Sequence, residues 1–253
     1  MFLVFNKDKV QTYMVSILTV AVLIAVANIN NIKTITTSAT LRSLPIYNVK
    51  TDEKKVAFTM NCAWNADDID SILETLKSND VKITFFMVGN WVDKYPEAVK
   101  KIHEAGHEIG SHSNTHPHVN NLSSEKNLEE IKLSVKKIEN LTGSKVELYR
   151  TPYGEYNDIV IQTAKENGYY PIQWDLDTLD YKGLTGDEMW NRIKNKLKNG
   201  SIILSHNGTK HTSDSLDMLI KNIKKQGYEI TTVSNLIYKD GFSIDNNGTQ
   251  IKN

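Results

Sequence analysis

The stretch ITFFMVGNWVDKYPEAVKKIHEAGHEIGSHSNTH, residues 83–116, contains the repeating unit of the fold. Its apolar start over residues 83–88 predicts a buried strand, and residues 96–105 predict a helix. Pro96 near the start of this helix and Gly106 after its end are typical of those two positions. A short strand-like segment follows and ends directly before two histidines, so a strand, a helix and a second strand succeed one another.

The same alternation extends in both directions along the chain. Further strands are expected over residues 55–60, 108–111, 146–149, 169–174, 201–205 and 228–232. Further helices are expected over residues 67–77, 123–141, 157–167, 185–198 and 213–226. About seven strands that alternate with helices predict a parallel sheet in an α/β domain, which is either a barrel or a doubly wound sheet.

The N-terminus predicts export from the cytoplasm. Residues 10–27 are uncharged and mostly apolar, and they follow Lys7 and Lys9. This run is near the lower length limit for a membrane-spanning helix, and a basic flank is typical of the cytoplasmic side. We favour a signal anchor. The alternative is a cleaved signal peptide, because Ala25-Val26-Ala27 fits a small-x-small cleavage site.

This interpretation divides the chain into five parts. Residues 1–9 would be a cytoplasmic n-region and 10–27 the membrane helix, followed by a stalk over 28–54, the compact domain over 55–238 and a polar tail over 239–253. The domain would lie outside the cytoplasm, at the cell membrane if the anchor is retained and secreted if it is cleaved.

Charge and cysteine content exclude some classes of protein. Thirty basic and thirty acidic residues leave no net charge, so nucleic acid is not expected as a partner. Cys62 is the single cysteine, so an intramolecular disulfide cannot form.

Polar or metal-binding residues follow five of the expected strands, where β/α folds carry their sites. These segments are Asn61-Cys62-Ala63-Trp64, His112-Ser113-Asn114-Thr115-His116, Arg150-Thr151-Pro152-Tyr153-Gly154, the trio Asp175, Asp177 and Asp180, and His206. His112 and His116 are four residues apart, so in a helical turn they share a face and can bind one cation. The alternative for this pair is two solvated loop histidines.

In order, five motifs resemble those of the polysaccharide deacetylases, carbohydrate esterase family four with the NodB homology domain. They are residues 58–64, 111–116, 150–154, 177–181 and 204–206, and the resemblance covers about 55–237. It is strongest to the sporulation- and cell-wall-associated branch of Gram-positive bacteria. The resemblance implies a distorted (β/α) barrel that removes N-acetyl groups from amino sugars of peptidoglycan or a chitin-like polysaccharide with a divalent metal.

The resemblance also implies roles for single residues. His112 and His116 would bind the metal, Arg150 would orient the side chain of motif one, and the Tyr153 backbone N–H would stabilise the oxyanion. His206 would be the general acid, with Asp177 as its orienting partner. The residues expected to contact substrate are Trp64, Tyr153, Leu204 at the acetyl methyl group, and Tyr181, which replaces a more usual Trp.

Motif one departs from the family pattern. The family usually reads Thr-Phe-Asp-Asp, with a base and then a metal ligand, whereas residues 59–62 read Thr-Met-Asn-Cys. Because a thiolate is a good zinc ligand, we expect Cys62 to complete a zinc site with His112 and His116; the alternative is a buried apolar thiol. Asn61 cannot accept a proton usefully. The candidates to replace the base are Asp67, Asp68, Asp175 and Asp177.

Three functions therefore compete. The first is a metal-dependent polysaccharide N-deacetylase, a hydrolase of carbon–nitrogen bonds other than peptide bonds. The second is a catalytically impaired relative that binds glycan, as Asn61 suggests. The third is a metalloamidase that acts on another acyl substrate.

Overall fold

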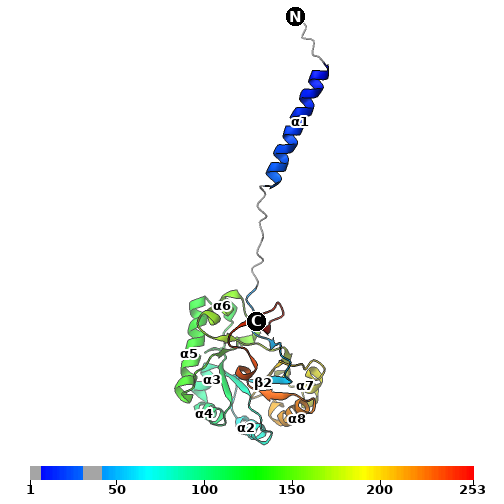
Figure 1. Ribbon diagram of the computed structural model, residues 1–253. Helices are drawn as coiled ribbons and strands as arrows, with labels where there is room; N and C mark the ends of the chain where they lie inside the picture. The colour runs from blue at the N-terminus through cyan, green and yellow to red at the C-terminus, as the bar shows by residue number, and fades with distance from the viewer. Residues whose placement is uncertain (1–6, 31–41) are drawn as a thin grey trace. The chain divides into compact units, whose positions relative to one another are not determined.

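The computed structural model describes residues 7–30 and 42–253, and the chain divides into two units, 1–41 and 42–253 (Figure 1). The first unit contains helix α1, Lys7–Asn30. Among the residues described, no helix combines the length and apolar character that crossing a bilayer requires. The predicted membrane span over 10–27 is therefore not supported. The Ala25-Val26-Ala27 cleavage site, whose side chains are not described, stays a prediction, and residues 1–6 and 31–41 lie outside the described part.

The second unit is built on a parallel sheet, which confirms the predicted α/β class. Its strands run in the order β6-β5-β4-β3-β2-β8-β7, with β9 paired to β2, and every pairing is parallel. The strands are β2 Lys55–Cys62, β3 Thr84–Met87, β4 Glu108–Ser111, β5 Leu148–Tyr149, β6 Tyr170–Pro171, β7 Leu176–Asp177, β8 Ile202–His206 and β9 Glu229–Thr231. The sheet curves into a distorted β/α barrel.

Helices connect these strands and cover the outside of the barrel (Figure 1). They are α2 Ile69–Ser78, α3 Gly89–Lys94, α4 Pro96–Glu104, α5 Ser124–Thr142, α6 Asp158–Glu166, α7 Gly186–Ile193 and α8 Thr212–Lys225. The short helix α9, Val233–Leu236, instead packs Val233 and Leu236 into the smaller of the two apolar clusters. Helix α5 begins where the Ser123 hydroxyl accepts a hydrogen bond from the Lys126 N–H, and it ends at Gly143 in the left-handed conformation. The sequence predicted this start and this end.

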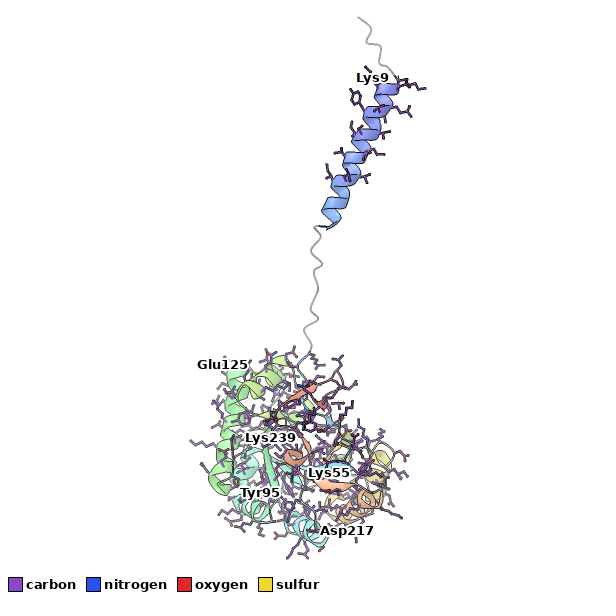
Figure 2. The ribbon with its side chains drawn as sticks, viewed as in Figure 1. Lys9, Lys55, Tyr95, Glu125, Asp217 and Lys239 are labelled. Carbon is purple, nitrogen blue, oxygen red and sulfur yellow. The ribbon has the colours of Figure 1, made fainter. Side chains whose placement is uncertain are left out.

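Strand β2 occupies the centre of the sheet and separates two apolar layers. It begins at Lys55, which Figure 2 labels. The Lys55 ammonium pairs with Glu53. Phe58 and Met60 belong to the larger core cluster, together with residues of the covering helices, whereas Ala57 belongs to the smaller cluster inside the barrel. Successive side chains of a strand point to opposite faces. Odd-numbered residues of β2 therefore face the barrel interior, and even-numbered residues face the helices.

The strand predicted over 169–174 is shortened to β6, and β7, which was not predicted, follows at the opposite edge of the sheet. Strand β6 pairs with β5, and β7 pairs with β8, so the barrel has a gap between β6 and β7. The segment around Ile46 crosses this gap: Ile46 forms a bridge with Ile172, and Asn48 forms one with Ser201. We call residues 46–49 the seam segment.

The predicted stalk and tail both contribute to the folded unit, which corrects two boundaries. Ile46 and Val49 are buried, and β1, Asn48–Val49, pairs with β11, Thr249–Lys252. Strand β10, Phe242–Ile244, completes this three-stranded sheet. Residues 46–49 and the segment after 238 are therefore parts of the folded unit, because each supplies backbone partners to the other.

Candidate active site

A cavity of about 500 Å³ opens at the carboxyl ends of the central strands. Its lining residues come from the five predicted motif segments and one addition, Trp174; they are Asn61, Ala63, Trp64, His112, His116, Thr151, Tyr153, Gly154, Trp174, Tyr181, Leu204 and His206. The structure therefore brings together most of the residues that the sequence singled out. The predicted residues that do not line this cavity are Cys62, Arg150, Asp67, Asp68, Asp175 and Asp177.

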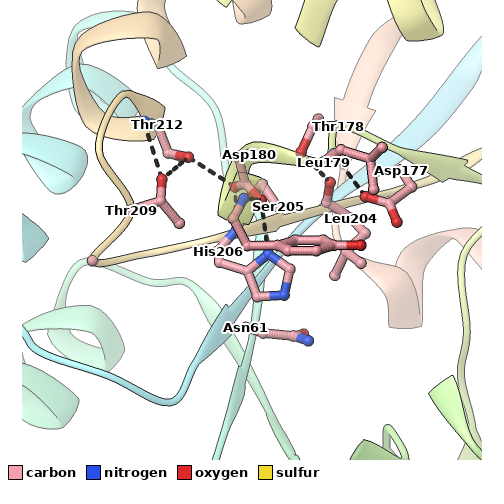
Figure 3. Close-up of polar contacts among 12 residues, drawn as sticks. Asn61, Asp177, Thr178, Leu179, Asp180, Leu204, Ser205, His206, Thr209 and Thr212 are labelled. Atoms are coloured by element: carbon pink, nitrogen blue, oxygen red, sulfur yellow. Dashed lines mark hydrogen bonds and ion pairs between the residues drawn. The ribbon is translucent and has the colours of Figure 1, made fainter. Parts of the chain in front are cut away.

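His206 is held by Asp180, which lies in the turn after β7 (Figure 3). The His206 Nδ1 atom lies 2.8 Å from Asp180 Oδ1, and Asp180 Oδ2 accepts a hydrogen bond from the His206 backbone N–H at 2.6 Å. The Thr212 hydroxyl donates to the same Oδ2. Because Nδ1 is engaged by a carboxylate, Nε2 is the ring nitrogen left for a ligand.

The prediction that Asp177 orients His206 is wrong. Asp177 Oδ1 accepts the Leu179 N–H at 2.8 Å and so caps its own turn. Leu179 has a positive φ of 54°, and this left-handed residue redirects the chain so that Asp180, not Asp177, reaches His206. The sequence contained both aspartates but gave no local signal for that reversal.

Arg150 lies completely buried behind the cavity, stacked over the Phe86 ring. Its Nη1 donates to the Thr59 hydroxyl at 2.8 Å and to Asn61 Oδ1 at 3.0 Å. Among the described residues it forms no ion pair with a carboxylate, and burial lowers its pKa to about 9. Its predicted contact with the motif-one side chain is present, but the partner is a neutral amide; the contact to Thr59 was not predicted.

His112 is buried and bound on both ring nitrogens. Its Nε2 lies 3.2 Å from Asn61 Nδ2, and its Nδ1 lies 2.9 Å from the Arg150 carbonyl oxygen. The His116 ring lies edge-on, 4.9 Å from the His112 ring. Burial lowers the pKa of His112 well below its usual range, and the neighbouring His116 lowers it further. His112 is therefore a neutral imidazole at physiological pH.

The loop that carries the two histidines is shaped by Glu130 on α5. Glu130 Oε2 accepts hydrogen bonds from the backbone N–H groups of Asn114 and Thr115 and from the Ser113 hydroxyl. Ser113 and His116 both have positive φ, a conformation costly for residues with a side chain. Glu130 offsets this cost. It was missed because a glutamate in the middle of a helix carries no distinctive sequence signal.

Cys62 does not belong to the cavity. As an even-numbered residue of β2 it faces the helices, where its thiol is buried in the larger apolar cluster and burial raises its pKa well above the usual value. Within residues 7–30 and 42–253, no group of three or more His, Cys, Asp or Glu side chains is arranged to hold a metal. The predicted zinc site of Cys62, His112 and His116 is therefore wrong, and the residues present do not fit a three-ligand metal centre.

Three of the four aspartates proposed as replacement bases, Asp68, Asp175 and Asp177, accept hydrogen bonds outside the cavity. Asp68 accepts hydrogen bonds from the Gly208 N–H and the Asn207 amide, and Asp175 accepts from the Ile202 N–H and the Ser201 hydroxyl. These contacts stabilise loops and strand ends. None of the four candidate aspartates lines the cavity, so no carboxylate replaces the missing base there.

Aromatic side chains form the rim of the cavity. Trp64, Tyr153 and Tyr181 are 48%, 58% and 45% exposed, and all three line the opening. The rings of Trp64 and Tyr181 lie 5.4 and 5.3 Å from the His206 ring. Tyr153 has a φ of 57°, so the backbone at this motif is strained. The predicted oxyanion role of its N–H stays a prediction.

Comparison with known proteins identifies the family. The family model described as Polysaccharide deacetylase matches residues 48–172. A peptidoglycan-N-acetylglucosamine deacetylase of Bacillus cereus is 34% identical over 196 residues, which cover 76% of this chain and 92% of that protein. The chain belongs to the polysaccharide deacetylase family. The predicted resemblance is thereby confirmed.

Two further polysaccharide deacetylase relatives show how the fold and the sequence compare. The uncharacterized protein YlxY of Bacillus subtilis is 36% identical over 197 residues, covering 78% of this chain and 61% of YlxY. The structure of BA3943 from Bacillus anthracis, a CE4 family pseudoenzyme, is 35% identical with a TM-score of 0.74 and covers 78% of this chain and 69% of that chain. The match therefore spans less than two thirds of YlxY.

Proposed function

We propose that this polysaccharide deacetylase relative binds an N-acetylated cell-wall or chitin-like glycan in the cavity without hydrolysing it at a rate typical of an enzyme. The observation that carries the proposal is the side chain of Asn61, which stands beside Arg150 where the family's base belongs. An amide cannot take a proton from water. Loss of a general base costs about 10²- to 10⁴-fold in rate.

The lining supports a carbohydrate ligand. A cavity of about 500 Å³ is within the range of small-ligand sites, and here its rim carries three exposed aromatic rings. Such rings provide apolar contact area at a small cost in conformational entropy. Inside the cavity, Leu204 offers an apolar surface for an acetyl methyl group, and His206 Nε2 offers a polar contact.

The relatives support both halves of the proposal. The Bacillus cereus relative is a peptidoglycan-N-acetylglucosamine deacetylase, and BA3943 is a pseudoenzyme of which one mutant has restored enzymatic activity. Loss of activity with retention of the fold therefore has a precedent in a protein 35% identical to this chain. Because peptidoglycan lies outside the cytoplasm, we also propose an extracytoplasmic location for this domain.

N-deacetylation is the second candidate, and the pair of His206 and Asp180 favours it. A histidine held by a buried carboxylate is suited to protonate a departing amine, and both residues needed for this role, His206 and Asp180, are in contact. The metalloamidase alternative loses its basis, because it depended on Cys62 as a ligand.

Binding and acetate release, measured together on the full chain, test the proposal. We expect an acetylated chitooligosaccharide or peptidoglycan fragment to bind, and acetate to stay at the level of a no-protein control. Replacing Trp64 or Tyr181 by Ala should weaken binding about 5- to 30-fold, equivalent to roughly 1–2 kcal/mol. Tyr13→Ala is the matched control, since Tyr13 is an exposed aromatic residue in the other unit.

Two outcomes would contradict the proposal. Acetate release that depends on His206 would establish the second candidate. If these glycans bind too weakly to measure, or if the rim substitutions leave the affinity unchanged, the glycan does not bind in this cavity.

A further inference from the structure

We infer that the Asn61 amide takes the place beside His112 Nε2 that a metal ion would otherwise need. The polar groups of Asn61, His112 and Arg150 are then paired with one another without a metal. The inference concerns the same cavity as the proposed function, but it does not require that a glycan binds. It rests on a closed ring of three hydrogen bonds among Asn61, His112 and Arg150.

The first contact fixes the orientation of the amide. A guanidinium has only donors, so the Asn61 atom that lies 3.0 Å from Arg150 Nη1 must be the amide oxygen. The amide nitrogen then faces His112 Nε2 at 3.2 Å. An amide NH₂ group can only donate, so Nε2 must accept.

The second contact fixes the same tautomer independently. His112 Nδ1 lies 2.9 Å from the backbone carbonyl oxygen of Arg150, which can only accept. Nδ1 therefore carries the proton, and the lone pair of the ring is on Nε2. Each of the three hydrogen bonds thus joins one donor to one acceptor. They use both nitrogens of the imidazole, both polar atoms of the Asn61 amide, and the guanidinium and carbonyl groups of Arg150.

A metal ion binds imidazole through its lone pair, and this lone pair already accepts the Asn61 amide. To reach it, a metal would have to displace the amide from Nε2. The metal would also approach Arg150, which is completely buried and, among the described residues, forms no ion pair with a carboxylate, although Asp177 acts on it electrostatically. A second cation beside a buried guanidinium that has no ion pair is unfavourable. The other imidazoles of the cavity are His116 and His206, and Asp180 holds Nδ1 of His206. Cys62 faces the opposite side of β2.

A carboxylate at position 61 would reverse this preference. One of its oxygens would still accept from Arg150, but the other would face the His112 lone pair, and two acceptors repel each other unless a cation lies between them. The Asn61→Asp substitution also supplies the missing counter-charge for Arg150. The same change therefore removes the internal bond and creates a position for a metal or a proton.

The test measures zinc on the full chain, with Asn191→Asp as the matched control. Asn191 is exposed on α7 and bonds to Lys194, so this control makes the same charge change away from the cavity. After equilibration with zinc chloride and gel filtration, we expect wild type and Asn191→Asp to retain far less than one zinc per chain. Asn61→Asp should bind zinc about 10- to 100-fold more tightly than wild type. Adding His116→Ala should abolish that gain.

A direct readout uses ¹⁵N-labelled histidine in the wild-type chain, so it does not depend on the folding of a variant. The His112 signals, assigned with a His112→Asn variant, should show a proton on Nδ1, and zinc chloride should leave the Nε2 shift unchanged. Stoichiometric zinc on wild type with a displaced Nε2 signal would overturn the inference. Equal zinc affinity of wild type and Asn61→Asp would overturn it as well. Glycan binding is measured separately, so either proposal can fail alone.

Discussion

Asp180 binds His206 at two points, with Oδ1 at the ring Nδ1 and Oδ2 at the backbone N–H, at 2.8 and 2.6 Å. The carboxylate is completely buried and also accepts the Thr212 hydroxyl, so it connects β8 to the start of α8 (Figure 3). One side chain therefore fixes both the position and the ring orientation of the histidine in the cavity.

Replacing Asp180 by Asn should be costly. The new NH₂ group would face donors, leave them without an acceptor in a buried position and lower the free energy of unfolding by about 3 kcal/mol. Urea unfolding measures the loss. Asp177→Asn is the matched control and should cost only about 1 kcal/mol, since Asp177 accepts one local backbone N–H at a half-buried site. Equal losses would assign the orienting role to neither residue.

His107 should make the domain sensitive to acid. Its Nδ1 accepts the Ile83 N–H, and burial lowers its pKa from 6.5 to about 4. Between these values the unfolded chain binds a proton that the folded domain does not. The free energy of unfolding should therefore fall by about 3 kcal/mol as pH decreases from about 6.5 to about 4.

The difference between wild type and His107→Gln isolates this contribution, because Gln retains an acceptor and does not titrate. Chemical unfolding across the pH range should show the gap between the two proteins narrowing toward pH 4. A constant gap would contradict the assignment.

The Cys62 thiol should be inert in the folded protein. It is buried, and burial keeps it in the neutral form, which is the unreactive one. A thiol reagent such as DTNB should label it only after denaturant is added. Cys62→Ser should also destabilise the domain by about 1–3 kcal/mol, because it places a hydroxyl in an apolar cluster. Rapid labelling of native protein would place the thiol in the open cavity instead.

Asn61→Asp should increase acetate release in the presence of zinc chloride. The substitution restores a proton acceptor beside Arg150. A positioned general base raises the rate about 10²- to 10⁴-fold. Because the site has two histidines for a metal, the variant should recover only part of this factor. Product acetate on an acetylated chitooligosaccharide measures it, with Asn191→Asp as the unchanged reference. Turnover by wild type as fast as by the variant would show that Asn61 is not what limits the rate.

Local patterns predicted the elements but not all of their relationships. The alternation of strands and helices followed from apolar periodicity, and the positions after β2, β4, β5 and β8 lie at one end of the sheet because parallel strands require it. Asn61 and Cys62 were both assigned to the site, although consecutive strand residues face opposite sides. That rule, applied to residues 59–62, would have placed Thr59 and Asn61 together and Cys62 apart.

Relationships between distant segments could not be predicted in this way. Asp180 reaches His206 because Leu179 is left-handed, and no motif specifies that conformation. The pairing of β1 with β11 joins segments about 200 residues apart, and both looked polar and irregular when read alone. These contacts are decided by which backbone groups remain unpaired after the barrel forms.

The seam segment determines at which residue a truncated form of the protein can begin. Ile46 exchanges backbone hydrogen bonds with Pro171 and Gln173 on one edge of the sheet, while Val49 bonds to Gly200 on the other, at a contact too close for any side chain at position 200. A fragment that starts at Lys55 would expose both edges and leave β11 with β10 as its single neighbour. Expression from residue 42 onward should therefore give a stable minimal domain, whereas expression from residue 55 should not.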